Sequence, residues 1–284
     1  MGKETSISWT RHTFNPWWGC EKVSPGCAHC YAETFSKRTG HTVWGANAPR
    51  RFFGDKHWGE PLRWDIDAAK LGERHRVFCA SMADWLEDRD DLVAPLAQLL
   101  ELIRVTPNLD WLLLTKRPEN WLKRITDAIM WNWCEDDQAA ALHAWGRNWI
   151  NGQPPANVWI GTTVEDQQRA DKRIPELLKI PAKVRFLSCE PLLGPVDLRG
   201  PGLYAGDSIA PAAIIDYEPR IHWAIAGGES GPGFRPFNPD WARSLRDQCK
   251  AAHVAFHMKQ MGGLKPSMMP STPNDLMIRE YPQP

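Results

Sequence analysis

Three cysteines stand close together near the start of the chain, at Cys20, Cys27 and Cys30. Their spacing is C-x6-C-x2-C, and no fourth cysteine follows nearby. Three thiolates can hold three irons of a cubane 4Fe-4S cluster and leave the fourth iron open to another ligand. The spacing therefore predicts a reactive iron–sulfur site rather than a sealed structural one.

The six-residue gap contains Ser24-Pro25-Gly26, a turn-forming sequence that can bring Cys20 back toward the other two cysteines. Two alternatives stay open at this point. The three residues can be ordinary free cysteines of a core, or zinc can take them together with one histidine. The nearby histidines that could complete a zinc site are His12, His29 and His41.

The letters N-P-W-W-G-C at Asn15–Cys20, followed by C-x-x-C-Y-A at Cys27–Ala32, resemble the radical S-adenosylmethionine (SAM) superfamily. Within it, the motif is similar to spore photoproduct lyase-like proteins and to a phage-associated three-Cys-motif branch. The chain departs from the usual superfamily spacing, C-x3-C-x2-C, and has His29 where an aromatic residue usually precedes the last cysteine. The resemblance is sharp over Asn15–Ala32 and only architectural elsewhere.

This resemblance implies an enzyme that carries a 4Fe-4S cluster on the three cysteines and uses SAM as its second cofactor. An external electron donor would reduce the cluster, and cleavage of SAM would give methionine and a 5′-deoxyadenosyl radical that abstracts hydrogen from a substrate. The neighbouring families, and tryptophan-rich inserts that could stack bases, indicate a nucleotide or nucleic-acid base as substrate, within a broader choice of small molecules. The alternative is a non-enzymatic α/β adaptor or binding protein stabilised by zinc.

The composition limits the partners. Formal charge is zero, from 34 basic and 34 acidic side chains, which argues against a strongly basic coat for nucleic acid. The opening Met-Gly-Lys-Glu-Thr is polar, so we expect no signal peptide, and no stretch reaches the length of a membrane span. We therefore expect a cytoplasmic protein with no membrane partner, in a reducing compartment that suits an oxygen-sensitive cluster.

Short apolar runs alternate with helical patterns along the chain, as in parallel strands buried on both faces. The runs are Ser6–Trp9, Val77–Ala80, Trp111–Thr115, Val158–Thr162, Val184–Ser188, Trp223–Ala226 and Val254–Met258. The helical patterns are Asp91–Val105, Pro118–Ile129, Asp166–Lys179 and a segment from Asn238 toward Ala252.

This alternation predicts an α/β fold, a partial or near-complete parallel (β/α) barrel with six to seven strand-helix units and long loop inserts. A complete eight-unit barrel or a doubly wound sheet stays open. We expect a single domain over residues 1–263 with inserts at about 39–74, 131–157 and 198–220, followed by an extended tail over 264–284.

Chemistry in parallel barrels gathers at the carboxyl ends of the strands, so the residues just after each apolar run are candidates. Ser81 and Asp84 follow the second run, where superfamily members often hold the SAM amino group. Glycines let a backbone approach a ligand closely. The cofactor-binding candidates are Ser81, Asp84, Thr162, Thr163, Glu165, Gly227 and Gly228.

Two acids and one thiol are the catalytic candidates at this edge. We expect Glu190 and Glu229 to bind a ligand or to handle a proton. Each could instead form a salt bridge, for which the cations at the strand ends are Lys116, Arg117 and Lys259. Cys189 adjoins the predicted mouth and is a candidate hydrogen-atom donor, although a small buried residue is the commoner role.

Overall fold

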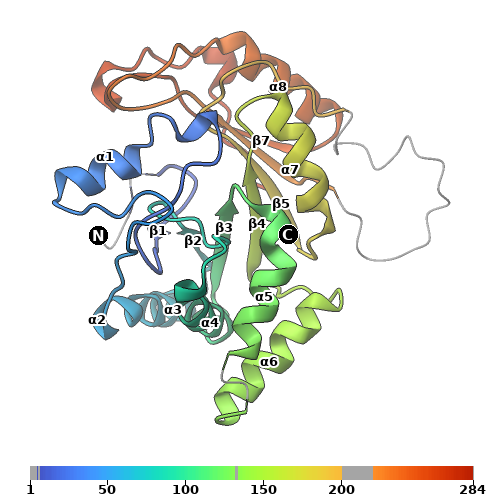
Figure 1. Cartoon of the computed structure of the whole chain (residues 1–284). Helices are drawn as coiled ribbons and strands as arrows, with labels where there is room; N and C mark the ends of the chain where they lie inside the picture. Colours follow the sequence, from blue (N-terminus) through green and yellow to red (C-terminus); the bar gives the residue numbers. More distant parts are fainter. Residues whose placement is uncertain (1–4, 6, 132–133, 200–219, 284) are drawn as a thin grey trace. The chain divides into compact units, whose positions relative to one another are not determined.

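Seven strands form one sheet in the computed structural model, which describes residues 5, 7–131, 134–199 and 220–283 (Figure 1). The strand order is β1-β2-β3-β4-β5-β6-β7, so each strand neighbours the next one along the chain. The bounds are β1 His12–Thr13, β2 His75–Cys79, β3 Leu109–Thr115, β4 Val158–Thr163, β5 Val184–Cys189, β6 Trp223–Gly227 and β7 Ala255–Gln260. With helices between the strands, this is the topology of a partial parallel (β/α) barrel, and the predicted fold class is confirmed.

The helices are α1 Tyr31–Arg38, α2 Asp55–Trp58, α3 Glu60–Leu71, α4 Val93–Arg104, α5 Trp121–Met130, α6 Asp137–Ile150, α7 Gln167–Lys179 and α8 Pro239–Ala251. Single 3-10 turns lie at Pro25–Cys27, Asp90–Leu92, Pro118–Asn120, Pro266–Met268 and Asn274–Leu276. Among the described residues, none of the helices has the length and apolar character needed to cross a membrane.

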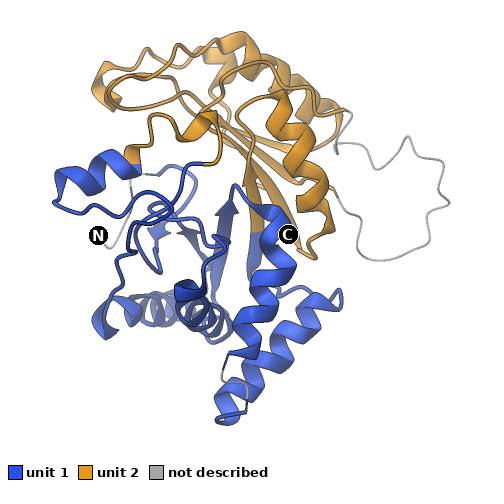
Figure 2. Cartoon of the chain, in the orientation of Figure 1, with its two compact units in different colours: residues 1–22, 32–159 blue, residues 23–31, 160–284 orange. Residues whose placement is uncertain are grey.

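The chain divides into two compact units (Figure 2). Unit 1 comprises residues 1–22 and 32–159, and unit 2 comprises residues 23–31 and 160–284. The division falls within β4 and on either side of the segment that carries Cys27 and Cys30. The predicted single domain over residues 1–263 stays a prediction, because compact units can belong to one fold.

In unit 1, β1, β2 and β3 pair in parallel, with Val77 opposite both His12 and Trp111. Helix α3 contacts β2 and β3. Helix α4 forms because apolar residues recur at helical spacing, and the side chains of that face are fully buried. The members of this apolar face are Leu96, Leu99, Leu100 and Ile103.

In unit 2, β5, β6 and β7 pair in parallel, with Trp223 opposite both Phe186 and Ala255. Two of the helices begin at side-chain caps. The Asp166 side chain accepts from the Arg169 N–H at the start of α7, and Asn238 accepts from the Asp240 N–H at the start of α8. Helix α8 contacts both β6 and β7. The Asn238 cap therefore fixes the start of a helix that packs on the sheet.

Ser6 of the predicted first strand, Ser6–Trp9, lies outside the described residues, and residues 7–9 are not in a strand. The bonds to β2 come from later residues, because the Arg11 N–H donates to Arg76 O and the Phe14 N–H donates to Phe78 O. The apolar run covers the core instead, since the Trp9 ring lies 4.6 Å from that of Phe78.

Two of the three predicted inserts contain helices. The insert predicted at about 131–157 contains a regular helix, α6, which Asp136 caps by accepting from the Ala139 N–H. The insert at about 39–74 contains α2 and α3. Most of the third insert, residues 200–219, lies outside the described part of the chain.

The tail lies against the last strand of the sheet. His257 forms an antiparallel bridge with Arg279. The Met258 N–H donates to Ile278 O at 2.9 Å, and the Glu280 N–H donates to Phe256 O at 3.0 Å. Residues 276–281 therefore continue the hydrogen bonding beyond β7.

Candidate functional site

Cys20 follows β1 on a loop that backbone bonds hold within unit 1. The Gly19 N–H donates to Met82 O at 3.0 Å, and the Gly45 N–H donates to Cys20 O at 2.9 Å. Asn15 of the N-P-W-W-G-C motif adds a side-chain link: its Oδ1 accepts from the Met82 N–H at 2.7 Å, and its Nδ2 donates to Ser81 Oγ at 3.1 Å. The predicted cofactor contact Ser81 thus joins the loop that precedes Cys20.

The Arg117 guanidinium reaches Cys20 directly. Arg117 Nη1 lies 3.7 Å from the Cys20 sulfur, and Nη2 donates to Glu21 O at 2.9 Å. The thiol itself points to that same carbonyl, at 3.4 Å. Burial raises the pKa of the Cys20 thiol to about 12, and Asp84 adds to the rise, while Arg117 opposes it.

Asp84 stands behind this arginine. Its Oδ1 accepts from Thr115 Oγ1 at 2.7 Å and from the Leu86 N–H at 3.1 Å. Its Oδ2 accepts from the Lys116 N–H at 2.9 Å and from Arg117 Nη1 at 2.8 Å. Burial opposes ionisation, but Arg117 and these donors lower the pKa of Asp84 below its ordinary value. Four donors fill the acceptor sites of one carboxylate, so Asp84 orients Arg117.

Cys27 and Cys30 lie on a short loop of unit 2. The predicted turn is confirmed: residues Pro25–Cys27 form a 3-10 turn, in which the Cys27 N–H donates to Ser24 O at 2.9 Å. The Ser24 hydroxyl lies 3.7 Å from the Cys27 sulfur. Both cysteines are half-buried, and neither forms a disulfide.

Glu165 supports this loop at Gly26. The carboxylate is fully buried, and its Oε1 accepts from the Gly26 N–H at 3.3 Å. Its Oε2 lies 2.6 Å from Arg173 Nη1, which also donates to Thr163 O at 2.8 Å. A residue predicted to contact the cofactor therefore holds the cysteine loop through a buried ion pair.

Glu229 supports the same loop at His29 and, through Arg235, at Pro25. Its Oε2 lies 3.2 Å from His29 Nδ1, and its two oxygens bind Arg235 in a bidentate pair at 2.6 and 2.9 Å. Arg235 Nη2 also donates to Pro25 O at 3.0 Å. Burial opposes ionisation of Glu229, but bonds from Arg235 and His29 lower the pKa of its carboxyl.

The remaining acid candidate pairs with a lysine. Glu190 Oε1 lies 2.9 Å from Lys259 Nζ, which is one of the salt bridges considered from the sequence. Gly227 is needed beside it, because a Cβ at that position would contact Glu190 Oε1. A Cβ at Gly228 would meet the Gly262 backbone. Both glycines thus allow a close approach to protein atoms, and their approach to a ligand stays a prediction.

Three other candidates are interior residues of unit 2. Thr162 and Cys189 are fully buried, and Thr163 is 1% exposed. Burial raises the pKa of the Cys189 thiol well above its ordinary value, so this thiol is protonated.

Two arginines that contact the cysteine loop or its support carried no sequence signal. Arg173 lies eight residues after the acid it binds and Arg235 lies six residues after its own, and neither spacing by itself indicates an ion pair. Arg117 could be found from its place directly after β3, although its contact with a thiol could not.

The seven cysteines differ in exposure. Cys20, Cys27 and Cys30 are half-buried, Cys134 is exposed, and Cys79, Cys189 and Cys249 are buried; none of the seven forms a disulfide. Within the part of the chain that the structure describes, no group of three or more His, Cys, Asp or Glu side chains is arranged to hold a metal ion.

A family model described as a protein of unknown function (DUF5131) matches residues 4–281. No curated protein matches the chain. Among solved structures, a spore photoproduct lyase mutant with bound AdoMet and dinucleoside spore photoproduct is 10% identical with a TM-score of 0.44; the match covers 88% of this chain and 57% of that one, under two thirds of its length.

Two further solved structures are similar at the same level. A second spore photoproduct lyase mutant is 9% identical with a TM-score of 0.47, over 92% of this chain and 81% of that one. Spore photoproduct lyase complexed with dinucleoside spore photoproduct is 10% identical with a TM-score of 0.43, over 86% and 75%.

Proposed function

The chain belongs to the DUF5131 family, and from its own residues we propose that it is a radical SAM enzyme. Cys20, Cys27 and Cys30 would hold a 4Fe-4S cluster, with SAM as the second cofactor. The observation that carries the proposal is the set of three half-buried cysteines, none of them in a disulfide, at C-x6-C-x2-C spacing. Three thiolates leave one iron open for an added ligand.

The donor set fits a cluster by its chemistry. Thiolates are the ordinary ligands of iron–sulfur clusters, and half-buried thiols can be reached while a cluster is assembled. The loop with Cys27 and Cys30 is held by Glu165 and Glu229, which fix its backbone without occupying the sulfurs. Side chains that hold a ligand from behind in this way fix its orientation.

When bound, the cluster and SAM would supply one-electron cleavage of the sulfonium bond and the abstraction of hydrogen from the substrate. The chain's part is to bind, orient and exclude water. We assign Ser81, Thr162 and Thr163 to hydroxyl contacts with SAM, and Gly227 and Gly228 to close backbone contacts. Asp84 and Glu165, already fully engaged with protein donors, would act by positioning Arg117 and the Gly26 turn.

The catalytic assignments concern three residues. Glu190 would bind substrate or hold a proton opposite Lys259, and Glu229 would act through His29 and Arg235. Cys189 would serve as a hydrogen-atom donor, a role that needs a neutral thiol and an interior position. Burial gives Cys189 both properties by excluding water and raising its pKa.

The proposed substrate is a nucleotide or nucleic-acid base, and the proposed partner is an external electron donor. The substrate class follows from the family resemblance of the Asn15–Ala32 motif. With zero formal charge overall, recognition of a nucleic acid would depend on local contacts rather than on a general attraction. Cytoplasmic location and a phage association stay predictions.

One observation favours a second candidate, a zinc-stabilised binding protein. His29 Nδ1 lies 3.2 Å from Glu229 Oε2, so the tautomer with the proton on Nδ1 leaves Nε2 as the acceptor nitrogen. A carboxylate behind a histidine is the usual arrangement for a metal-binding imidazole. Zinc on the three cysteines and His29 would be a Cys3His site.

Metal and sulfide analysis separates these candidates. Protein purified and reconstituted without oxygen should contain about four irons and four sulfides per chain. After reduction it should convert SAM to 5′-deoxyadenosine, and Cys27→Ala should abolish both the cluster and this product. Cys134→Ala is the matched control, because it removes an exposed thiol outside the motif.

Two results would count against the enzyme. Stoichiometric zinc without uptake of iron would support the binding protein, and full iron loading without SAM binding or cleavage would exclude the radical SAM assignment.

A further inference from the structure

Arg117 brings a charged donor to one thiol of the motif, that of Cys20. Its guanidinium spans two neighbouring acceptors, the Cys20 sulfur at 3.7 Å and Glu21 O at 2.9 Å. Arg117 is 8% exposed, so water competes weakly for these bonds. A planar guanidinium suits this task, since its fork of N–H groups can face two acceptors at once.

The hydrogen bonds around Cys20 are complete when the sulfur is a thiolate. As a thiol, Cys20 points its S–H at Glu21 O, 3.4 Å away. A metal-bound cysteine has no proton to donate, so this bond is lost on ligation. Arg117 Nη2 already supplies a donor to the same carbonyl, and Nη1 supplies one to the sulfur. Ligation of Cys20 therefore leaves no acceptor unsatisfied at this point.

The arginine is held in place from behind. Asp84 binds Nη1 at 2.8 Å, and the three other donors to Asp84 fix the carboxylate on two loops of unit 1. The Arg117 N–H also donates to Thr115 Oγ1 at 2.9 Å. The donor thus approaches the sulfur from a direction set by several bonds rather than by a flexible side chain.

We infer that Arg117 is a positioning residue that donates a hydrogen bond to the ligating Cys20 sulfur and raises the reduction potential of the bound cluster. This inference rests on the proposed function. Hydrogen bonds to cluster sulfurs and nearby charge are among the factors that set the potential, because they stabilise the more negative reduced form. Removing the donor should make the cluster harder to reduce.

Two variants separate the hydrogen bond from the charge. Arg117→Met alone leaves Asp84 buried without its cation, which can unfold the region. The double variant Arg117→Met with Asp84→Asn removes one positive and one negative charge, so the net charge near Cys20 is unchanged while the N–H donor to sulfur is lost. Arg117→Lys keeps the positive charge but loses the planar set of N–H donors that faces two acceptors at once.

The control is Arg124→Met. Arg124 is another fully buried arginine of unit 1, and it pairs with Asp88 and Asp127 rather than with a cysteine. The measurement is the reduced fraction of the reconstituted cluster against applied potential, followed by electron paramagnetic resonance, with iron counted per chain. In the double variant we expect about a tenfold lower ratio of reduced to oxidised cluster at a fixed potential, or about 59 mV for one electron. Arg117→Lys should lie between that variant and the wild type, and Arg124→Met should match the wild type.

Each outcome decides one question. If the wild type takes up no iron, the proposed function fails and this inference fails with it. If all proteins load iron and the double variant has the wild-type potential, the inference is overturned while the proposed function stands. An equal shift in Arg124→Met would also overturn it, because the effect would then come from any buried arginine.

Discussion

The two cysteine regions use ion pairs in opposite orientations. Beside Cys20, an arginine faces the sulfur and the carboxylate of Asp84 stands behind it. Beside the loop of Cys27 and Cys30, carboxylates face the loop: Glu165 accepts from the Gly26 N–H, with an arginine behind it.

The two regions differ in what their ion pairs act on, which is the charge of a sulfur in one and the geometry of a loop in the other. A cation next to a thiol stabilises negative sulfur, so the surroundings of Cys20 act on the electronic state of that residue. Glu165 accepts from a backbone N–H and so holds the path of the chain. Glu229 binds the His29 side chain and acts on the same loop through that residue. One region therefore acts on the charge of a sulfur, and the other holds the backbone that carries two cysteines.

The largest effect should come from the loop support. Glu165→Ala leaves Arg173 as a buried cation without its partner and removes the acceptor of the Gly26 N–H. Loss of one member of a buried pair costs about 3–5 kcal/mol. We expect this decrease in the free energy of unfolding in urea denaturation of the metal-free protein, together with faster proteolysis between residues 22 and 31.

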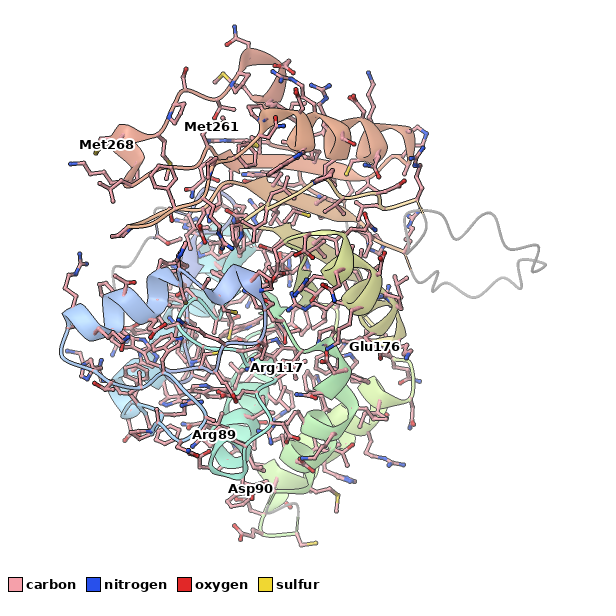
Figure 3. All side chains as sticks on the ribbon, turned by 45° about the horizontal axis from the view of Figure 1, so that its top comes forward. Arg89, Asp90, Arg117, Glu176, Met261 and Met268 are labelled. Atoms are coloured by element: carbon pink, nitrogen blue, oxygen red, sulfur yellow. The ribbon has the colours of Figure 1, made fainter. Side chains whose placement is uncertain are left out.

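The matched control is Glu176→Ala, which removes a partly exposed glutamate paired with Lys179 on α7 (Figure 3). Surface pairs contribute up to about 1 kcal/mol. Equal losses in the two variants would show that the buried pair does not hold the loop.

Two glycines test how rigid each region is. Gly19 has φ of +117°, and a Cβ there would meet the carbonyl of Val43, whereas a Cβ on Gly26 would lie 2.9 Å from the end of the Glu165 side chain. Gly19→Ala should cost about 1–3 kcal/mol, because backbone must move. Gly26→Ala should cost less, since a side chain can move.

Urea midpoints provide the measurement, and Gly194→Ala gives the reference, because nothing lies within 4 Å of a Cβ at Gly194. If Gly26→Ala proved the more damaging of the two, the Cys27 loop would be the more rigid region and the comparison would reverse.

The smallest effect should appear in acid. Burial raises the pKa of Glu229, yet Arg235 and His29 lower it to below its ordinary value, so the folded state binds its proton less readily than the unfolded chain. The stability from this ionised pair is full above the unfolded pKa of about 4.3 and is lost as pH falls through the folded pKa. Thermal midpoints of the wild type and Glu229→Gln should therefore converge below about pH 4.3.

The same titration with Glu135→Gln is the control, because Glu135 is exposed. Its curve should follow that of the wild type. A constant difference between the wild type and Glu229→Gln down to pH 3 would contradict the role of ionised Glu229.

Six of the seven strands could be predicted because each contains a buried apolar run. The first could not, since β1 is His12–Thr13 and has no apolar signal. Its place is decided by backbone bonds to β2, and the more hydrophobic Trp9 packs beside the sheet. Helix α6 was missed although Asp136 begins it with an ordinary cap.

The site was predictable in its positions and less so in its contacts. Glu165, Glu190 and Glu229 follow strands, as expected, because strand ends are read from local patterns. Their partners Arg173, Lys259 and Arg235 are brought to them by the fold. Ion pairing depends on distance in space, which the spacing of residues along one sequence does not give.

The tail beside β7 has a consequence for solubility. A strand at the margin of a sheet exposes unpaired N–H and C=O groups that can recruit strands of other molecules. Residues 276–281 occupy those groups through Ile278 and Glu280, and the proline at 282 can donate no further bond. The tail thereby covers the open edge of β7, where strands of other molecules could otherwise pair and begin aggregation.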